Sequence, residues 1–124
     1  MRVLAFSLIF LALLGCNKNR PLTAHGKPVQ HWIEALQNPD VKARKKAVEV
    51  LSNVGTADPA VIPALTGALK DREAGVRSAA VLALLRLGPA AREAIPALKE
   101  TQKDRDPNVR NQATKALENI QSEK

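Results

Sequence analysis

Aromatic residues are scarce in this chain, and their scarcity excludes several classes of protein. Tyrosine is absent, and aromatic residues make up 2% of the 124 residues. Both phenylalanines, Phe6 and Phe10, lie in the first ten residues, so Trp32 is the single aromatic residue of the remainder. Proteins that bind single-stranded nucleic acids stack the bases on aromatic rings. The composition therefore disfavours nucleic-acid binding, although the net charge is +7.

Residue patterns that carry catalysis or hold metals are also missing. The chain has one cysteine, so it forms no internal disulfide. His25 and His31 are the two histidines, and the one acid at helical spacing from either is Glu34, which is too little for a metal site. We find no pair of catalytic acids, no nucleophile with a base and no glycine-rich phosphate loop. We expect no enzymatic activity, no cofactor, no metal and no small-molecule substrate.

The residues that are abundant are small and aliphatic. Alanine, leucine and valine dominate after the first segment of the chain. Alanine and leucine favour helices, and small side chains let two helix axes approach closely. We therefore predict an all-α fold without strands.

The first residues have the form of a secretory signal. Arg2 precedes an apolar run over residues 3–14. A helix of that length rises too little to cross a hydrocarbon core of about 30 Å, so a lasting transmembrane span is not expected. The run ends in Leu13-Leu14-Gly15-Cys16, which resembles the bacterial lipobox. This resemblance implies that residues 1–15 are removed and that Cys16 carries lipid. The alternative is a conventionally cleaved signal with a lone thiol.

Residues 16–27 are polar and show no apolar periodicity. We predict a flexible tether between lipid and folded domain. Its cations either contact anionic head groups or only keep the linker soluble. In lipoproteins an aspartate after the modified cysteine indicates inner-membrane retention, so Asn17 favours the outer membrane.

The remainder of the chain, residues 28–124, repeats itself with an offset of 33 residues. The segment Ile62-Pro63-Ala64-Leu65 recurs as Ile95-Pro96-Ala97-Leu98. Three units follow without gaps, at about 29–61, 62–94 and 95–124. Repeats of this length are typical of solenoids, and three units are about the minimum for stability.

Each unit contains two helical patterns joined by a polar turn. In the second pattern of the first unit, Ala43, Ala47, Leu51 and Val54 form one apolar stripe of a helix. We expect these helices to begin at Asn38-Pro39 and Asp106-Pro107, where a cap precedes proline, and to end at Gly55 and Gly88.

The order of residues in the units resembles the short HEAT-like repeat of the phycobilisome-lyase type. The shared pattern is Ile-Pro-Ala-Leu, an Asp turn, Val-Arg, Ala-Leu and a closing Leu-Gly. Ankyrin and tetratricopeptide signatures are absent. The resemblance implies an α-α superhelix of three helix pairs. The first unit departs from the pattern and is expected to act as an N-terminal cap.

The resemblance also implies that turn aspartates and helix-start arginines of neighbouring units form a hydrogen-bonded ladder. The matching positions are Arg44, Asp71, Arg77, Asp104 and Arg110. The alternative is that the three aligned arginines, Arg44, Arg77 and Arg110, bind an anionic ligand.

The second helices offer a candidate binding face opposite the apolar stripe. Its members are Lys42, Lys45, Lys46, Glu49, Ser78, Leu82, Arg86, Asn111 and Lys115. The simplest interpretation is a solvated charged surface. The alternative is a groove that binds a partner, as solenoids do through extended surfaces. Leu82 is the most informative position, because it is either a contact point or additional packing.

These observations predict a lipid-anchored module in the cell envelope that binds an unknown protein partner without catalysis. Two alternatives remain: a structural subunit that stacks on another solenoid, and an accessory to bilin attachment. A repeat identifies architecture, so function has to be argued from a site.

Overall fold

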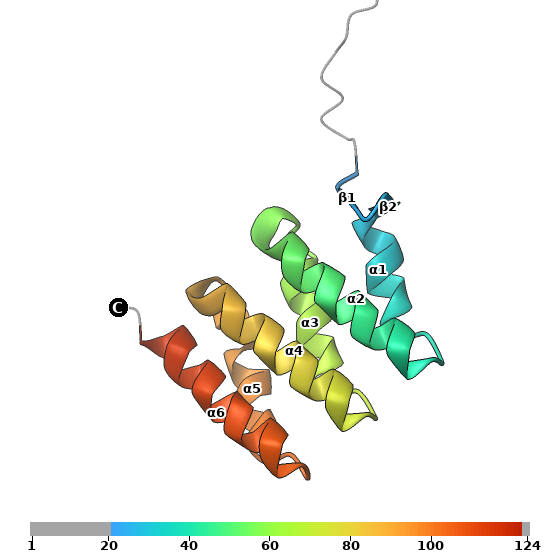
Figure 1. Ribbon diagram of the computed structural model, residues 1–124. Helices are drawn as coiled ribbons and strands as arrows, with labels where there is room; N and C mark the ends of the chain where they lie inside the picture. The colour runs from blue at the N-terminus through green and yellow to red at the C-terminus, as the bar shows by residue number, and fades with distance from the viewer. Residues whose placement is uncertain (1–20, 123–124) are drawn as a thin grey trace, which may run out of the picture.

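The computed structural model describes residues 21–122. The signal segment, the lipobox and Cys16 lie outside the described residues. Within them, three helix pairs stack in sequence order, which confirms the predicted all-α solenoid. In Figure 1 the second helices of the pairs lie side by side in one layer, with α3 and α5 behind them.

The helix pairs follow the predicted units closely. The first pair is α1 (Val29–Ala35) and α2 (Val41–Val54), followed by the short 3-10 helix η1 (Gly55–Ala57). The second pair is α3 (Val61–Ala68) and α4 (Ala74–Leu87), followed by the 3-10 segment η2 (Gly88–Ala94). The third pair is α5 (Ile95–Thr101) and α6 (Pro107–Gln121).

The ends of the second helices are set by polar caps and glycines. Asp106 caps α6, with Pro107 as its first residue, as the sequence predicts. The start predicted at Asn38-Pro39 is wrong by two residues, because Asp40 is the cap of α2 and accepts a hydrogen bond from the Lys42 N–H. Asn38 instead accepts from the Asp40 N–H and holds the turn that leads into the helix. Gly55 and Gly88 end α2 and α4 with φ of 57°, a conformation that favours glycine.

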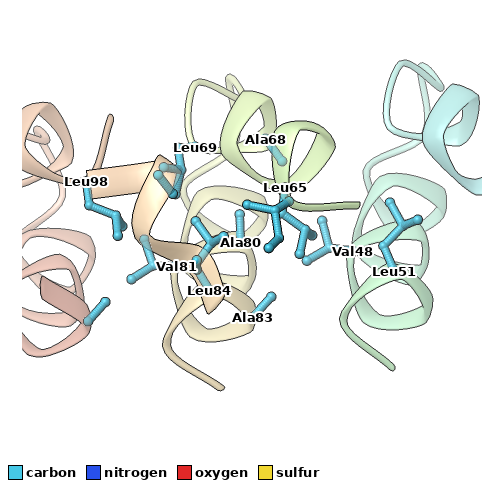
Figure 2. Close-up of a cluster of buried hydrophobic side chains, with 14 of the residues drawn as sticks. Val48, Leu51, Leu65, Ala68, Leu69, Ala80, Val81, Ala83, Leu84 and Leu98 are labelled. Carbon is cyan, nitrogen blue, oxygen red and sulfur yellow. The ribbon is translucent and has the colours of Figure 1, made fainter. Parts of the chain in front are cut away.

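The core is a continuous column of aliphatic side chains between the two helix layers. Leu51, Leu65, Leu84 and Leu98 are fully buried and come from four different helices. Figure 2 shows leucines and valines of neighbouring pairs meeting there, with alanines on the helices between them. The small alanines let neighbouring helices approach closely. Each pair buries its apolar side chains against the pairs adjacent to it.

A small hairpin precedes the first helix, so the prediction of a fold without strands is wrong at this point. The strands β1 (Thr23–Ala24) and β2 (Lys27–Pro28) pair antiparallel. His25 and Gly26 both have positive φ, which is the geometry of a tight two-residue turn. The Trp32 indole Nε1 donates to the Ala24 carbonyl over 2.9 Å and ties the hairpin to α1. The tether predicted for residues 16–27 is therefore ordered at its end.

The last helix pair replaces apolar residues by polar ones on the side away from the rest of the solenoid. One column of the repeat reads Leu36, Leu69 and then Gln102, and only the two leucines are buried. Another column ends in Thr114, and Gln102 Nε2 donates to the Thr114 hydroxyl over 3.1 Å. A hydrogen-bonded polar pair thus covers the place where a further helix pair would need an apolar surface.

One helical stretch of the described residues, Ala74–Thr101, passes a length and composition test for a membrane-spanning helix. It has 28 residues and contains an 18-residue window of mean hydropathy 1.2. It comprises α4, η2 and α5, and its helical geometry is broken at Ala91. Since α4 packs between α2 and α6, the apolar character of this stretch belongs to the solenoid core.

The packing of α4 predicts very different costs for two neighbouring leucines. We expect Leu84→Ala to lower the free energy of unfolding by about 2–5 kcal/mol, because it leaves a cavity in the core. Leu82→Ala, on the exposed side of the same helix, should change it by no more than about 0.5 kcal/mol. Urea unfolding followed by circular dichroism measures both. Equal losses for the two variants would contradict the packing described above.

Candidate interaction surface and the ladder that supports it

A buried arginine connects the first helix pair to the second. Arg44 on α2 is almost completely buried and donates from Nε and Nη2 to the two carboxylate oxygens of Asp71, over 2.9 and 3.2 Å. Its Nη1 donates to the carbonyls of Asn38 and Pro39 in the preceding turn. The guanidinium therefore fixes its own turn and the next one at the same time.

The second connection repeats this geometry. Arg77 on α4 donates to Asp104 over 2.8 and 3.0 Å, and its Nη1 donates to the Asp71 carbonyl over 2.8 Å. The side chain of Arg77 is 6% exposed and that of Asp104 is 10% exposed. We call these two bidentate pairs, Arg44–Asp71 and Arg77–Asp104, the ladder.

Arg110, the third predicted arginine, has no aspartate partner within residues 21–122. Its Nη1 donates to the carbonyls of Asp104 and Arg105, so it fixes its own turn only. At the other end Asn38 occupies the position of the turn aspartates. Arg44 and Arg77 use their guanidinium groups in internal hydrogen bonds. They are therefore unavailable to an anionic ligand.

The pairing with Arg77 lowers the pKa of Asp104. Burial alone would raise that pKa, but hydrogen bonds from the Arg77 side chain and the Asp106 N–H, with the positive charges of Arg77 and Arg105, lower it below its usual value of 3.8. Because the folded state holds the carboxylate more strongly than the unfolded state does, ionised Asp104 stabilises the fold.

The sequence did not predict a second set of hydrogen bonds between the repeats. Arg72 donates from Nη2 to the Pro39 carbonyl, and Arg105 donates in the same way to the Arg72 carbonyl. The repeat offset places Pro39, Arg72 and Arg105 in one column. The recurrence of arginine at positions 72 and 105 is the signal in the sequence that could have indicated these bonds.

The nine residues of the candidate binding face come from three helices, α2, α4 and α6. Lys42, Lys45, Lys46, Glu49, Leu82, Arg86, Asn111 and Lys115 are exposed, and Ser78 is half-buried. Leu82 is 41% exposed, which is high for a large apolar side chain. We call the surface of these nine residues the outward face; Figure 1 shows the helices that form it.

Several polar residues of the outward face hold neighbouring helices together. The Ser78 hydroxyl donates to the Gln112 side chain over 2.7 Å, and Arg86 donates to the Ser52 hydroxyl over 3.2 Å. Lys46 pairs with Glu49 on the same helix. Within residues 21–122, Lys42, Lys45 and Lys115 form no ion pair, so their charges are available to a partner.

Lys45 reaches from α2 across to the start of α4. A Cβ atom built on Gly75 would lie 2.7 Å from Lys45 Cε and 2.8 Å from Lys45 Nζ. The absence of a side chain at Gly75 therefore permits this position of the ammonium group, which brings a charge of α2 against the first turn of α4.

The net positive charge of the described chain lies on the outward face. Its nine residues include five cations and one carboxylate, Glu49. In the rest of residues 21–122 the cations and carboxylates are equal in number. The outward face is thus a basic surface with one exposed leucine near its middle.

The two histidines lie at the N-terminal end, where His31 lines one cavity together with Lys46 of the outward face. The rings of His25 and His31 pack edge-on against Trp32, with ring centroids 6.0 and 5.2 Å from it. Lys27 lies 3.3 Å from the His31 ring, and Glu34 accepts a hydrogen bond from Gln30. Trp32 also lines this cavity, which has a volume of about 500 Å³. The described residues hold no cluster of three or more potential metal ligands.

The ladder predicts a pH-dependent cost for Asp104→Asn. At neutral pH we expect this variant to lose about 3 kcal/mol of unfolding free energy, because the buried Arg77 charge loses its counterion. The deficit should shrink as the pH falls below 3.8 and through the lowered pKa of Asp104, where the native protein loses the same charge. Urea titrations at several pH values measure it.

A matched control is Glu100→Gln, which breaks the exposed pair between Glu100 and Lys103. That pair should contribute no more than about 0.5 kcal/mol at any of these pH values. An equal loss in the two variants would show that burial of the ladder is unimportant.

Comparisons with known proteins agree with this architecture. The chain matches the HEAT repeats family over residues 29–118, which span all three helix pairs. No curated protein matches it. A crystal structure of an engineered protein superposes with a TM-score of 0.57 at 25% sequence identity, covering 76% of this chain and 45% of that one. This chain therefore spans less than half of that engineered protein. The chain belongs to the HEAT repeat family.

Proposed function

We propose that the protein is a non-catalytic interaction module that binds a protein partner and is held at a bacterial membrane by lipid on Cys16. HEAT repeats generally mediate protein interactions, which supports the first part of the proposal. The observation that carries it is the outward face, where Lys42, Lys45 and Lys115 have charges that no described carboxylate neutralises and Leu82 is exposed.

The rigidity of the scaffold supports this role. The ladder and the bonds of Ser78 and Arg86 fix the spacing of α2, α4 and α6. A surface that is ordered before binding loses less conformational entropy when the partner arrives. The charged groups of the described chain are in structural pairs, in turns or on exposed helix sides, which favours recognition over a reaction.

Support for the anchor comes from the sequence. Leu13-Leu14-Gly15-Cys16 follows a basic residue and an apolar run of signal-peptide form. Acyl chains gain about 0.8 kcal/mol for each buried CH₂ group, so a multiply acylated cysteine is a durable anchor. The gapless offset of 33 residues and the Ile-Pro-Ala-Leu motif favour repeats of the phycobilisome-lyase type. We place the module on an envelope membrane, with Asn17 favouring the outer one.

The polar end of the third helix pair argues against the alternative of stacking on another solenoid. Stacking would bury Gln102, Thr114 and the neighbouring Glu118 at positions where the second pair has Leu69, Val81 and Leu85. Burial of polar groups without partners is costly, and Glu118 carries a charge. The outward face is the better candidate for contact with another protein.

The anchor can be tested with Cys16→Ser. We expect the native protein to partition into the detergent phase and its mature N-terminus to be a modified Cys16, because lipidation precedes cleavage in lipoproteins. The variant should lose the lipid mass in mass spectrometry and retain residues 1–15. A native mature chain that begins at another residue, or that stays in the aqueous phase, would refute the anchor.

Binding through the outward face can be tested with photo-crosslinking residues placed at Leu82 and at Lys45. Both positions are exposed on adjacent helices, so we expect them to capture one and the same protein in intact cells. Photo-crosslinkers at Pro96 and Lys99 on α5 are matched controls in the other layer and should not capture it. Capture of no protein from Leu82 and Lys45, or the same capture from α5, would contradict the proposed function.

A further inference from the structure

We infer that the partner bound by the outward face is an acidic protein segment with an apolar side chain that seats on Leu82. This inference rests on the proposed function and specifies the chemistry of the partner. It follows from charge complementarity, from the single exposed leucine of the face and from the unequal distribution of cations over the three helices.

The charge of the outward face selects for carboxylates. The outward face has five cations and one carboxylate, Glu49, and Glu49 is paired with Lys46. The remaining cations lie on all three helices, with Lys42 and Lys45 on α2, Arg86 on α4 and Lys115 on α6. A segment rich in aspartate and glutamate would neutralise them, whereas a basic segment would be repelled.

Leu82 distinguishes a protein segment from a purely ionic ligand. It lies on α4, the middle helix, and is 41% exposed. In the repeat, Glu49 and Lys115 occupy its equivalent positions on α2 and α6. An apolar side chain flanked by charges gains from contact with an apolar group of the partner, and a phosphate backbone offers none in such a position.

The face also lacks the groups that favour a nucleic acid. Its residues in α2, α4 and α6 include no aromatic ring on which a base could stack. Because Lys46 pairs with Glu49, Lys42 and Lys45 are the lysines of α2 that remain for anionic groups. A protein segment can place its carboxylates opposite these two positions.

The distribution of cations predicts the orientation of the segment. Lys42, Lys45 and Lys46 are on α2, whereas α6 contributes Lys115 with amides such as Asn111. The carboxylates should therefore be densest over α2. Lys45 is the residue of α2 that we expect to contribute most to binding, because the open space over Gly75 lets its ammonium group lie against α4.

The experiment uses the full chain carrying Cys16→Ser in non-ionic detergent, with fluorescent synthetic peptides as probes. One peptide has a central leucine among aspartates and glutamates. A second replaces that leucine by serine, and a third replaces the acidic residues by lysines. Fluorescence anisotropy at low and at physiological salt gives the affinities.

We expect the acidic leucine peptide to bind most tightly and the lysine peptide not to bind. Lys45→Glu should weaken binding about tenfold at low salt, and the effect should diminish at higher salt. Lys99→Glu on α5 makes the same change in net charge outside the face and should alter the affinity by less than about twofold. Equal effects of the two reversals would overturn the inference.

Two further variants test the geometry. Gly75→Ala displaces the Lys45 ammonium without a change in charge, and alanine favours the helix, so weaker peptide binding by a folded variant is expected. Leu82→Ser should weaken the leucine peptide several-fold and leave the serine peptide unchanged, because the coupling between two contacting groups appears only when both are present. Equal losses for both peptides, or unchanged binding in Gly75→Ala, would overturn the inference.

Competition separates the inference from other anionic ligands. A short-chain phosphatidylglycerol or a single-stranded oligonucleotide that binds more tightly than the acidic leucine peptide, with the same dependence on Lys45, would overturn it in favour of a membrane or a nucleic acid. If none of the peptides binds while Leu82 still captures a protein in cells, the proposed function stands and the acidic partner is refuted. If the acidic peptide binds as described but no protein is captured, the proposed function fails in the cell and the chemistry of the face is retained.

Discussion

The structure depends most on the bidentate bonds between a buried arginine on one helix pair and a turn aspartate on the next. Taking both charges out of water is costly, and the cost is offset only if nearly every donor and acceptor finds a partner. Arg44 and Arg77 meet that condition, since each also binds carbonyls of its own preceding turn. A small error in the spacing of two helix pairs would leave a charge buried without its partner. The ladder therefore selects one spacing, and the aliphatic core supplies most of the stability at that spacing.

The two ends of the solenoid show how a three-unit array avoids open apolar faces. At the N-terminal end, Trp32 ties the hairpin to the start of α1, and Asn38 has an amide at the position where the turns of the later pairs have an aspartate. At the other end, Gln102 and Thr114 bond to each other in columns that are otherwise Leu and Val. Terminal repeats with polar outer faces are a general need of solenoids.

The outward face combines a rigid backbone with free cations. Ser78 and Arg86, which the sequence groups with the binding residues, contact neighbouring helices instead. Lys42, Lys45, Leu82 and Lys115 remain available to a partner, and the nine residues of the face together carry the net charge of the described chain. On a lipid tether such a face would meet its partner close to the membrane. Recognition by charge around one apolar contact gives specificity and fast encounter more than it gives high affinity.

The sequence alone determined the helix pairs, most of their boundaries near glycine and proline, and most of the buried stripes. The resemblance to HEAT-like repeats indicated the ladder, although Arg110 is not part of it. The sequence could indicate these features because a repeat shows the same local signal several times at a fixed offset. It did not reveal the hairpin, whose His25-Gly26 turn is held by a bond from Trp32 that is distant in sequence. It also placed the start of α2 two residues early, since Asn38 and Asp40 have similar cap chemistry. Only the tertiary structure decided which lysines are free and that Gly75 admits Lys45, because those properties depend on how adjacent helices approach each other in space.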